Sequence, residues 1–186
     1  SRRDQENFAT DEHCPVFYRK DKFRLLGSDT FWLSETPGTP SKSWDSSMNR
    51  ICTWAKLEDK STGFIFVLMN THFDHLGAQA RLNSALLMNE KAREFGCPVV
   101  VTGDFNCRES QAPYLTLTAG PLRDVKYAAR DTMAGGTFNG FAGDGEYYPG
   151  SPIDFIFINA GFDALSYRIV HGLRQGRFAS DHFAVW

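Results

Sequence analysis

Short apolar runs separated by polar, glycine-containing turns make up most of the chain, and one segment carries a helical repeat. The runs at 51–57 and 64–69 flank a Lys-Ser-Thr-Gly turn, which predicts a β-hairpin whose second strand is central. A helix is predicted next, because apolar residues recur at helical spacing until Gly96. A strand beginning at Val99 then completes a β-α-β step. The helical positions are Leu82, Ala85, Leu86 and Ala92.

The remaining pattern predicts more strands and two long loops. Apolar runs at 14–19, 23–26 and 30–33 are separated by turn residues and predict an antiparallel meander. Ser34–Met48 is rich in serine and proline and predicts a functional loop, in which Trp44 packs beneath the loop or lines a substrate lip; packing is the favoured alternative. Further along, we expect a short helix from Ser110 to Gly120, a loop at 131–152 with one short strand, and strands at 153–158, 164–170 and after residue 182.

Composition favours a single domain, residues 1–186, with a sizeable core, since 42% of the 186 residues are apolar. A formal net charge of −2 excludes a global basic field for nucleic acid, so local groups would have to bind such a substrate. The 4 cysteines lack a CxxC spacing and are expected to be small buried residues. No run approaches the roughly 18 to 20 apolar residues of a membrane span. The polar N-terminus is unlike a signal peptide, and localisation stays undetermined.

The stretch from Val99 to Asn106 carries the first chemical signal. Three valines predict a buried strand that ends in Gly-Asp-Phe-Asn. If the extended geometry continues past Gly103, the period of two places Asp104 and Asn106 on the same side and predicts a catalytic rim. The structural alternative is an Asx turn, which such residues commonly form after a strand.

Polar residues also gather at three other predicted strand ends. Each has an ordinary explanation, such as a hydrogen-bonded histidine or a satisfied buried carboxylate. Together they suggest a shared site, because neighbouring carboxylates need a cation or a protonated histidine to balance them. Oxygen ligands predominate, which favours a hard divalent cation over zinc. The rival is a zinc site from His72, Asp74 and His75, although alternation would turn His75 to the opposite face. The residues are Asn70, His72, Asp74 and His75, then Asp154, then Asp181 and His182.

Four motifs occur in a fixed order: Asn-Thr-His-Phe-Asp-His at 70–75, Gly-Asp-Phe-Asn at 103–106, Ile-Asp-Phe-Ile at 153–156 and Ser-Asp-His at 180–182. In this order they resemble the endonuclease/exonuclease/phosphatase, or DNase I-like, superfamily. Segments 17–20, 30–37 and 50–54 resemble a bacterial and fungal branch of it. The resemblance implies an α+β fold, a four-layer α/β/β/α sandwich of two mixed, mostly antiparallel sheets. It also implies hydrolysis of a phosphoester by metal-assisted attack of water, with Mg²⁺ or Mn²⁺ as cofactor. It does not identify the phosphoester, which can be a diester, a nucleic acid or a monoester.

The resemblance further implies catalytic roles. Asp104 would position and deprotonate the attacking water, with Asn106 holding that water or a phosphate oxygen. His182 would contact the phosphate or transfer a proton, and Asp154 would orient its imidazole ring.

Three more residues receive roles from the same resemblance. His72 would stabilise the charge that develops on the phosphoryl oxygen, and Arg50 would add a bidentate phosphate contact. Asp181 is a candidate metal ligand. We expect a phosphoester as the partner, with nucleic acid among the candidates but a small, non-polymeric ester preferred because the net charge is near zero. A monomer is expected.

One departure from the family pattern stands out. Members of the superfamily begin with a strand that carries an Asn, followed by a Glu that is a principal metal ligand, and this chain lacks both. Glu6, Glu12 and Glu35 do not follow a strand in the expected way, so none is assigned that role. Two interpretations follow: a piece of a longer enzyme, which we favour because losing core strands would expose an apolar edge, or a non-catalytic phosphate-binding or interaction module without its metal site.

Overall fold

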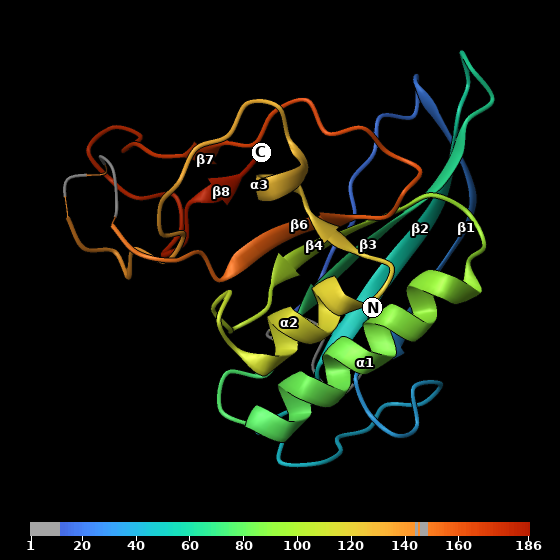
Figure 1. The fold of residues 1–186 in the computed structure, drawn as a ribbon, viewed down its shortest axis with the longest axis horizontal. Helices are drawn as coiled ribbons and strands as arrows, with labels where there is room; N and C mark the ends of the chain where they lie inside the picture. Colours follow the sequence, from blue (N-terminus) through green and yellow to red (C-terminus); the bar gives the residue numbers. More distant parts are fainter. Residues whose placement is uncertain (1–11, 144, 146–148) are drawn as a thin grey trace.

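A computed structural model describes residues 12–143, 145 and 149–186, and a six-stranded mixed sheet forms its centre. Helices α1 (Ala78–Glu94) and α2 (Ala112–Ala119) lie side by side against one face of this sheet (Figure 1). A two-stranded sheet and helix α3 (Val125–Ala128) lie at its β6 side. The predicted α+β class, with two sheets and helices outside, is confirmed. The strands are β1 (Phe23–Trp32), β2 (Ile51–Asp59), β3 (Ile65–His72), β4 (Val99–Asp104), β5 (Arg123–Asp124), β6 (Asp154–Ile158), β7 (Ile169–Val170) and β8 (Ala184–Val185).

The central part of the large sheet follows the predicted connections. Its strand order is β1-β2-β3-β4-β6-β5. Strands β2 and β3 form the expected antiparallel hairpin, and β3 pairs parallel with β4. A parallel pair needs a crossover connection, which α1 provides. Ala85, Met88 and Ala92 are buried on α1, because helical spacing places them on the face that meets the sheet. Strands β3 and β4 therefore end at the same edge.

The meander predicted before residue 34 is wrong in two respects. Residues 14–19 form no strand; Pro15 has no N–H to donate to a sheet, and its carbonyl accepts from the Asn70 side chain at 2.9 Å. The runs at 23–26 and 30–33 belong to the single strand β1, which passes the expected turn with a β-bulge between Leu25 and Gly27. A Cβ atom on Gly27 would lie 3.8 Å from the Trp54 ring, which is an ordinary contact, so the continuation follows from pairing with β2 rather than from the glycine.

Three predictions for the second half also need correction. Helix α2 begins after Gln111 and not Ser110, because Pro113 suits the first turn and Gln111 is its N-cap. The strand expected within 131–152 is an isolated bridge between Phe138 and His182, while residues 144 and 146–148 lie outside the described part of the chain. The strand expected at 164–170 is limited to β7, preceded by a bridge at Ser166.

The loop between β1 and β2 is fixed to the start of α1. The Asp45 carboxylate accepts from the backbone N–H groups of Ala80 at 2.7 Å and Gln79 at 3.2 Å, which caps the helix. Trp44 lines a hollow with Leu86 and Leu87 of α1.

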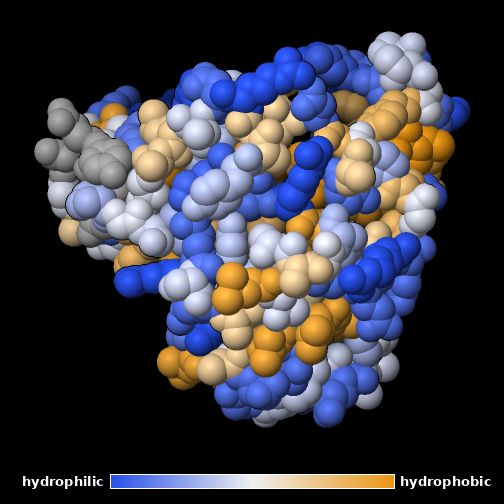
Figure 2. Space-filling view, in the orientation of Figure 1, coloured by the Kyte–Doolittle hydropathy of each residue, from blue (hydrophilic) through white to orange (hydrophobic). Residues whose placement is uncertain are grey.

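The surface of the molecule and the state of its cysteines can be compared with what the composition predicted. Polar side chains interrupt the apolar ones over α1 and α2 in Figure 2. Within the part of the chain described here, no helix is long and apolar enough to cross a membrane. The cysteines are free thiols; Cys14, Cys52 and Cys107 are buried as expected, whereas Cys97 is only partly buried.

Gly103 provides a test of how tightly β3 and β4 approach each other. Its φ is +149°, and a Cβ atom on it would lie 2.0 Å from the Thr71 carbonyl oxygen. We expect Gly103→Ala to lower the free energy of unfolding by about 3 kcal/mol, because backbone strain and a backbone clash combine. Urea unfolding measures this change.

The matched control is Gly38→Ala, since no atom lies within 4 Å of the position of its Cβ. We expect this control to stay within about 0.5 kcal/mol of the wild type. Equal stability of the two variants would contradict the close approach at Gly103.

Candidate active site

Three polar side chains lie in one row across neighbouring strands. His72 pairs with Asp104 in the parallel β3–β4 ladder, and Asp104 pairs with Asp154 in the antiparallel β4–β6 ladder. Carboxylates directly opposite each other repel, so this row needs a positive charge beside it.

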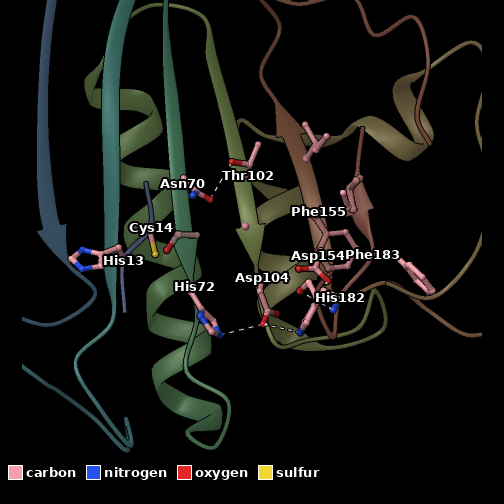
Figure 3. A pocket seen from close by; sticks show the side chains of 16 residues that line it. His13, Cys14, Asn70, His72, Thr102, Asp104, Asp154, Phe155, His182 and Phe183 are labelled. Atoms are coloured by element: carbon pink, nitrogen blue, oxygen red, sulfur yellow. Dashed lines mark hydrogen bonds and ion pairs between the residues drawn. The ribbon is translucent and has the colours of Figure 1, made fainter. Parts of the chain in front are cut away.

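Two histidines face the central carboxylate of this row (Figure 3). The His72 Nε2 atom lies 3.2 Å from Asp104 Oδ2, and the His182 Nε2 atom lies 4.0 Å from the same oxygen. The His182 Nδ1 atom is 2.7 Å from Asp154 Oδ2. Asp104 therefore lies between two imidazole rings, and Asp154 orients one of them through its far nitrogen.

The pKa of His182 is raised above its ordinary value. The hydrogen bond to Asp154 is the main cause, and burial, which acts in the opposite direction, is outweighed by it and by the negative charges of Asp154, Asp104 and Asp181. The protonated imidazolium can donate from both nitrogens, one toward Asp154 and one toward Asp104. Such a ring supplies the positive charge that the opposed carboxylates require.

Thr137 holds this part of the site, within the segment 131–152 that the sequence predicted as a loop with one short strand. The buried Thr137 hydroxyl accepts from the backbone N–H of Ile153 at 3.0 Å and of Asp154 at 3.2 Å. The Thr137 carbonyl accepts from the N–H of Phe183 at 2.7 Å, next to His182. One threonine thus joins the start of β6 to the histidine segment. In the sequence, only the polar residues Thr137 and Asn139 within this glycine-rich stretch indicated a role in holding the site together.

Glu12 is a second residue that the sequence analysis did not assign. Its Oε2 atom lies 3.6 Å from His72 Nδ1 and 3.6 Å from an Arg50 nitrogen, Nη1. His72 thus has Glu12 on one side and Asp104 on the other, much as His182 lies between Asp154 and Asp104. Glu12 precedes an extended segment without a strand, so no periodicity marked it.

Asn106 adopts a left-handed conformation with φ of 47°, so the extended geometry ends at Asp104. Its backbone N–H donates to Asp104 Oδ1 at 2.8 Å, which is the Asx turn considered as the alternative. Its side-chain nitrogen donates to the Phe73 carbonyl at 2.9 Å. The turn leaves Asp104 Oδ2 facing the histidines, so the turn does not occupy the oxygen that the expected role requires.

Arg50 was expected to contact phosphate, and His72, Asp74 and His75 formed the rival zinc site. The structure places these side chains differently. The Arg50 side chain is 3% exposed and lies beneath the rim, with Nη2 3.0 Å from His75 Nδ1. Asp74 turns into the protein, 3.6 Å from Arg50 Nε, while His72 faces Asp104. The set His72, Asp74 and His75 is therefore not assembled into one metal site.

The structure does assemble one group suited to a cation among the residues it describes. One ligand atom each of Asp104, Asp154 and His182 lies within 4.8 Å of the others. The two carboxylates supply the oxygen ligands that a hard divalent cation takes, and such a cation would offset their repulsion in place of a protonated His182 ring. Asp181 is not part of this group; its carboxylate accepts from the Ser180 hydroxyl at 3.3 Å.

A cavity of about 590 Å³ opens over this row. Asn70 and Thr102 extend it along the sheet away from the carboxylates, and Figure 3 shows their side chains beside it. The Thr102 hydroxyl is 3.3 Å from Asn70 Oδ1. Volumes of this order accommodate small-molecule substrates.

Comparison with known proteins identifies related sequences and folds. The profile of the endonuclease/exonuclease/phosphatase family matches residues 38–182. A structure of a family protein from Bacteroides thetaiotaomicron is 39% identical with a TM-score of 0.82, and the alignment covers 90% of this chain and 64% of that one. The mannosyl-6-phosphatase of the same species is 39% identical with a TM-score of 0.83, covering 90% of this chain and 67% of that one.

A more distant relative is nocturnin from Drosophila melanogaster. It is 29% identical over 127 residues, which is 63% of this chain and 18% of the nocturnin chain. The chain thus spans 64% of the length of the first Bacteroides structure and a smaller part of nocturnin.

The Asp154–His182 hydrogen bond can be tested by titration. We expect Asp154→Asn to lower the pKa of His182, because the main cause of its rise is removed. A raised folded-state pKa contributes stability below the ordinary value of 6.5 that is lost as the pH rises through the raised pKa, so Asp154→Asn should reduce this pH-dependent stability. NMR titration of the His182 ring measures the shift.

Asp181→Asn is the matched control, because its carboxylate acts on His182 through charge alone. We expect a smaller fall in the pKa of His182. Identical titration of the wild type and Asp154→Asn would contradict the role of the hydrogen bond.

Proposed function

The chain belongs to the endonuclease/exonuclease/phosphatase family, and we propose that it hydrolyses phosphoesters with the help of Mg²⁺ or Mn²⁺. The observation that carries this proposal is the convergence of Asp104, Asp154 and His182 at one cavity, with His72 on the other side of Asp104. Carboxylates and imidazoles in such a cluster can bind a cation, accept a proton from water and donate one to an oxygen.

The cation would be held by Asp104 and Asp154, and we keep Asp181 as a further candidate ligand. When bound, the cation supplies Lewis-acid polarisation of a phosphoryl oxygen. The fit rests on two carboxylates paired directly across β4 and β6, whose repulsion a cation would relieve.

The residues of this chain perform the proton transfers. Asp104 accepts the proton of the attacking water at Oδ2, because Oδ1 already accepts from the Asn106 N–H. His182 donates from Nε2 to a phosphoryl or leaving-group oxygen while Asp154 holds Nδ1. His72 donates to the phosphoryl oxygen on the opposite side, and the second amide hydrogen of Asn106 is left for the water or a phosphate oxygen.

For the substrate, we propose a phosphomonoester of a small polar alcohol, such as a hexose 6-phosphate. Support comes from the 39% identity with the Bacteroides mannosyl-6-phosphatase, and from a net charge of −2 that offers no general attraction to a polyanion. The volume of the cavity, about 590 Å³, suits a small ester.

The test is hydrolysis by the full-length protein of bis(4-nitrophenyl) phosphate, 4-nitrophenyl phosphate and a hexose 6-phosphate. We expect activity with Mg²⁺ that EDTA abolishes. Asp104→Ala and His182→Ala should each lower kcat/KM at least about 100-fold, since each removes a proton-transfer group.

Asp163→Ala is the control, because Asp163 forms an exposed ion pair with Arg130 and should leave hydrolysis unchanged. Hydrolysis that persists in the Asp104 and His182 variants would contradict the mechanism. Calorimetric binding of phosphate without Mg²⁺ binding and without hydrolysis would instead support the non-catalytic module.

A further inference from the structure

A buried carboxylate and a buried guanidinium lie beneath the rim of the site. The side chain of Asp74 is 1% exposed and that of Arg50 is 3% exposed. Asp74 accepts five hydrogen bonds: from Gly77 N at 2.7 Å, Leu76 N at 3.0 Å, Ser47 N at 3.0 Å, Ser47 Oγ at 2.6 Å and Ser46 Oγ at 3.2 Å. Burial alone would raise the pKa of Asp74, but these bonds outweigh it and lower the pKa, so the group stays ionised.

Arg50 is much less well satisfied than Asp74. Its Nε and Nη1 atoms are buried and form no hydrogen bond with any part of the chain that the structure describes; they lie 3.6 Å from Asp74 and Glu12. The third nitrogen of the Arg50 guanidinium, Nη2, forms a hydrogen bond of 3.0 Å to His75 Nδ1. Burying a charged pair costs free energy. Because the buried pair of Asp74 and Arg50 contacts the exposed ring of His75, we look for a role of the pair in positioning that ring.

The contact selects the tautomer of the neutral His75 ring. A guanidinium has only N–H donors and keeps its charge in proteins, so His75 Nδ1 has to accept. The proton of the neutral ring therefore resides on Nε2. Because His75 is exposed, this Nε2–H group is available to a ligand.

We propose that His75 is a further substrate-contacting residue, whose Nε2–H donates to an oxygen of the phosphoester, with Arg50 and Asp74 as its positioning residues. This inference rests on the proposed function. His75 follows His72 by three positions, and the guanidinium that binds His75 also faces Glu12, the partner of His72. The two imidazoles are thus joined through Arg50 and Glu12, and the ring of His72 lines the cavity of the site.

The first experiment measures the tautomer without reference to activity. Long-range ¹H–¹⁵N NMR spectra of the wild-type protein should show His75 protonated at Nε2 alone. Arg50→Met should shift the ring toward a mixture of tautomers, because His75 Nδ1 loses its hydrogen-bond donor. A wild-type ring protonated at Nδ1 would overturn the inference.

The second experiment separates binding from chemistry. We expect His75→Ala to raise KM for a hexose 6-phosphate about 10-fold, as for one lost hydrogen bond to a charged or polar oxygen, with kcat within about twofold of the wild type. His75→Gln should restore much of the binding, since its amide nitrogen can donate near the place of Nε2. Leu76→Ala is the control, because the neighbouring Leu76 is 69% exposed and its backbone bond to Asp74 is retained.

Inorganic phosphate distinguishes the two possible acceptors. A weaker inhibition constant for phosphate in His75→Ala assigns the contact to a phosphate oxygen, and an unchanged constant with a raised KM assigns it to a hydroxyl of the alcohol. His75→Ala with both values unchanged overturns the inference. A wild-type protein that hydrolyses none of the esters contradicts the proposed function instead, and calorimetry with phosphate on the wild type and His75→Ala then decides the role of His75.

Discussion

The register of three strands is the constraint on which the candidate site depends. Parallel pairing of β3 with β4 and antiparallel pairing of β4 with β6 place His72, Asp104 and Asp154 in one row. A shift of one residue would turn these side chains to the opposite face of the sheet. The row sets two carboxylates against each other, and the flanking imidazoles partly offset that repulsion. The cost of this arrangement is what makes a cation site plausible on physical grounds.

The hydrophobic core holds that register through phenylalanines adjacent to the polar residues. His72, Asp104, Asp154 and His182 are each followed in the sequence by a buried phenylalanine. The rings of Phe73 and Phe105 lie 4.8 Å apart, and those of Phe105 and Phe155 lie 5.9 Å apart, in edge-to-face contact. Each polar group is thus oriented by the packing of its neighbour, so that core and site specify each other.

Hydrophobic periodicity and turn residues predicted those elements of the fold and of the candidate site that neighbouring residues in the sequence determine. The β2–β3 hairpin, α1 and the polar strand ends all follow from periodicity and turn residues. The β1 bulge was missed because the pairing with β2, a segment distant in sequence, carries the strand through the expected turn residues. Glu12 and Thr137 were missed for the same reason, since each reaches the site through a contact with a distant segment. The local sequence pattern does not predict contacts between segments that are distant in sequence. The four motifs, by contrast, identified the family by their order.

Asp104 illustrates why a structural and a functional interpretation of one residue need not exclude each other. One carboxylate oxygen accepts the Asn106 N–H and closes the turn after β4, and the other faces both histidines. The amide of Asn106 is held in turn by the Phe73 carbonyl. The turn therefore fixes the orientation of the carboxylate before any substrate arrives. A group oriented in advance loses little freedom when it accepts a proton, which is the advantage of a preorganised site over a flexible one.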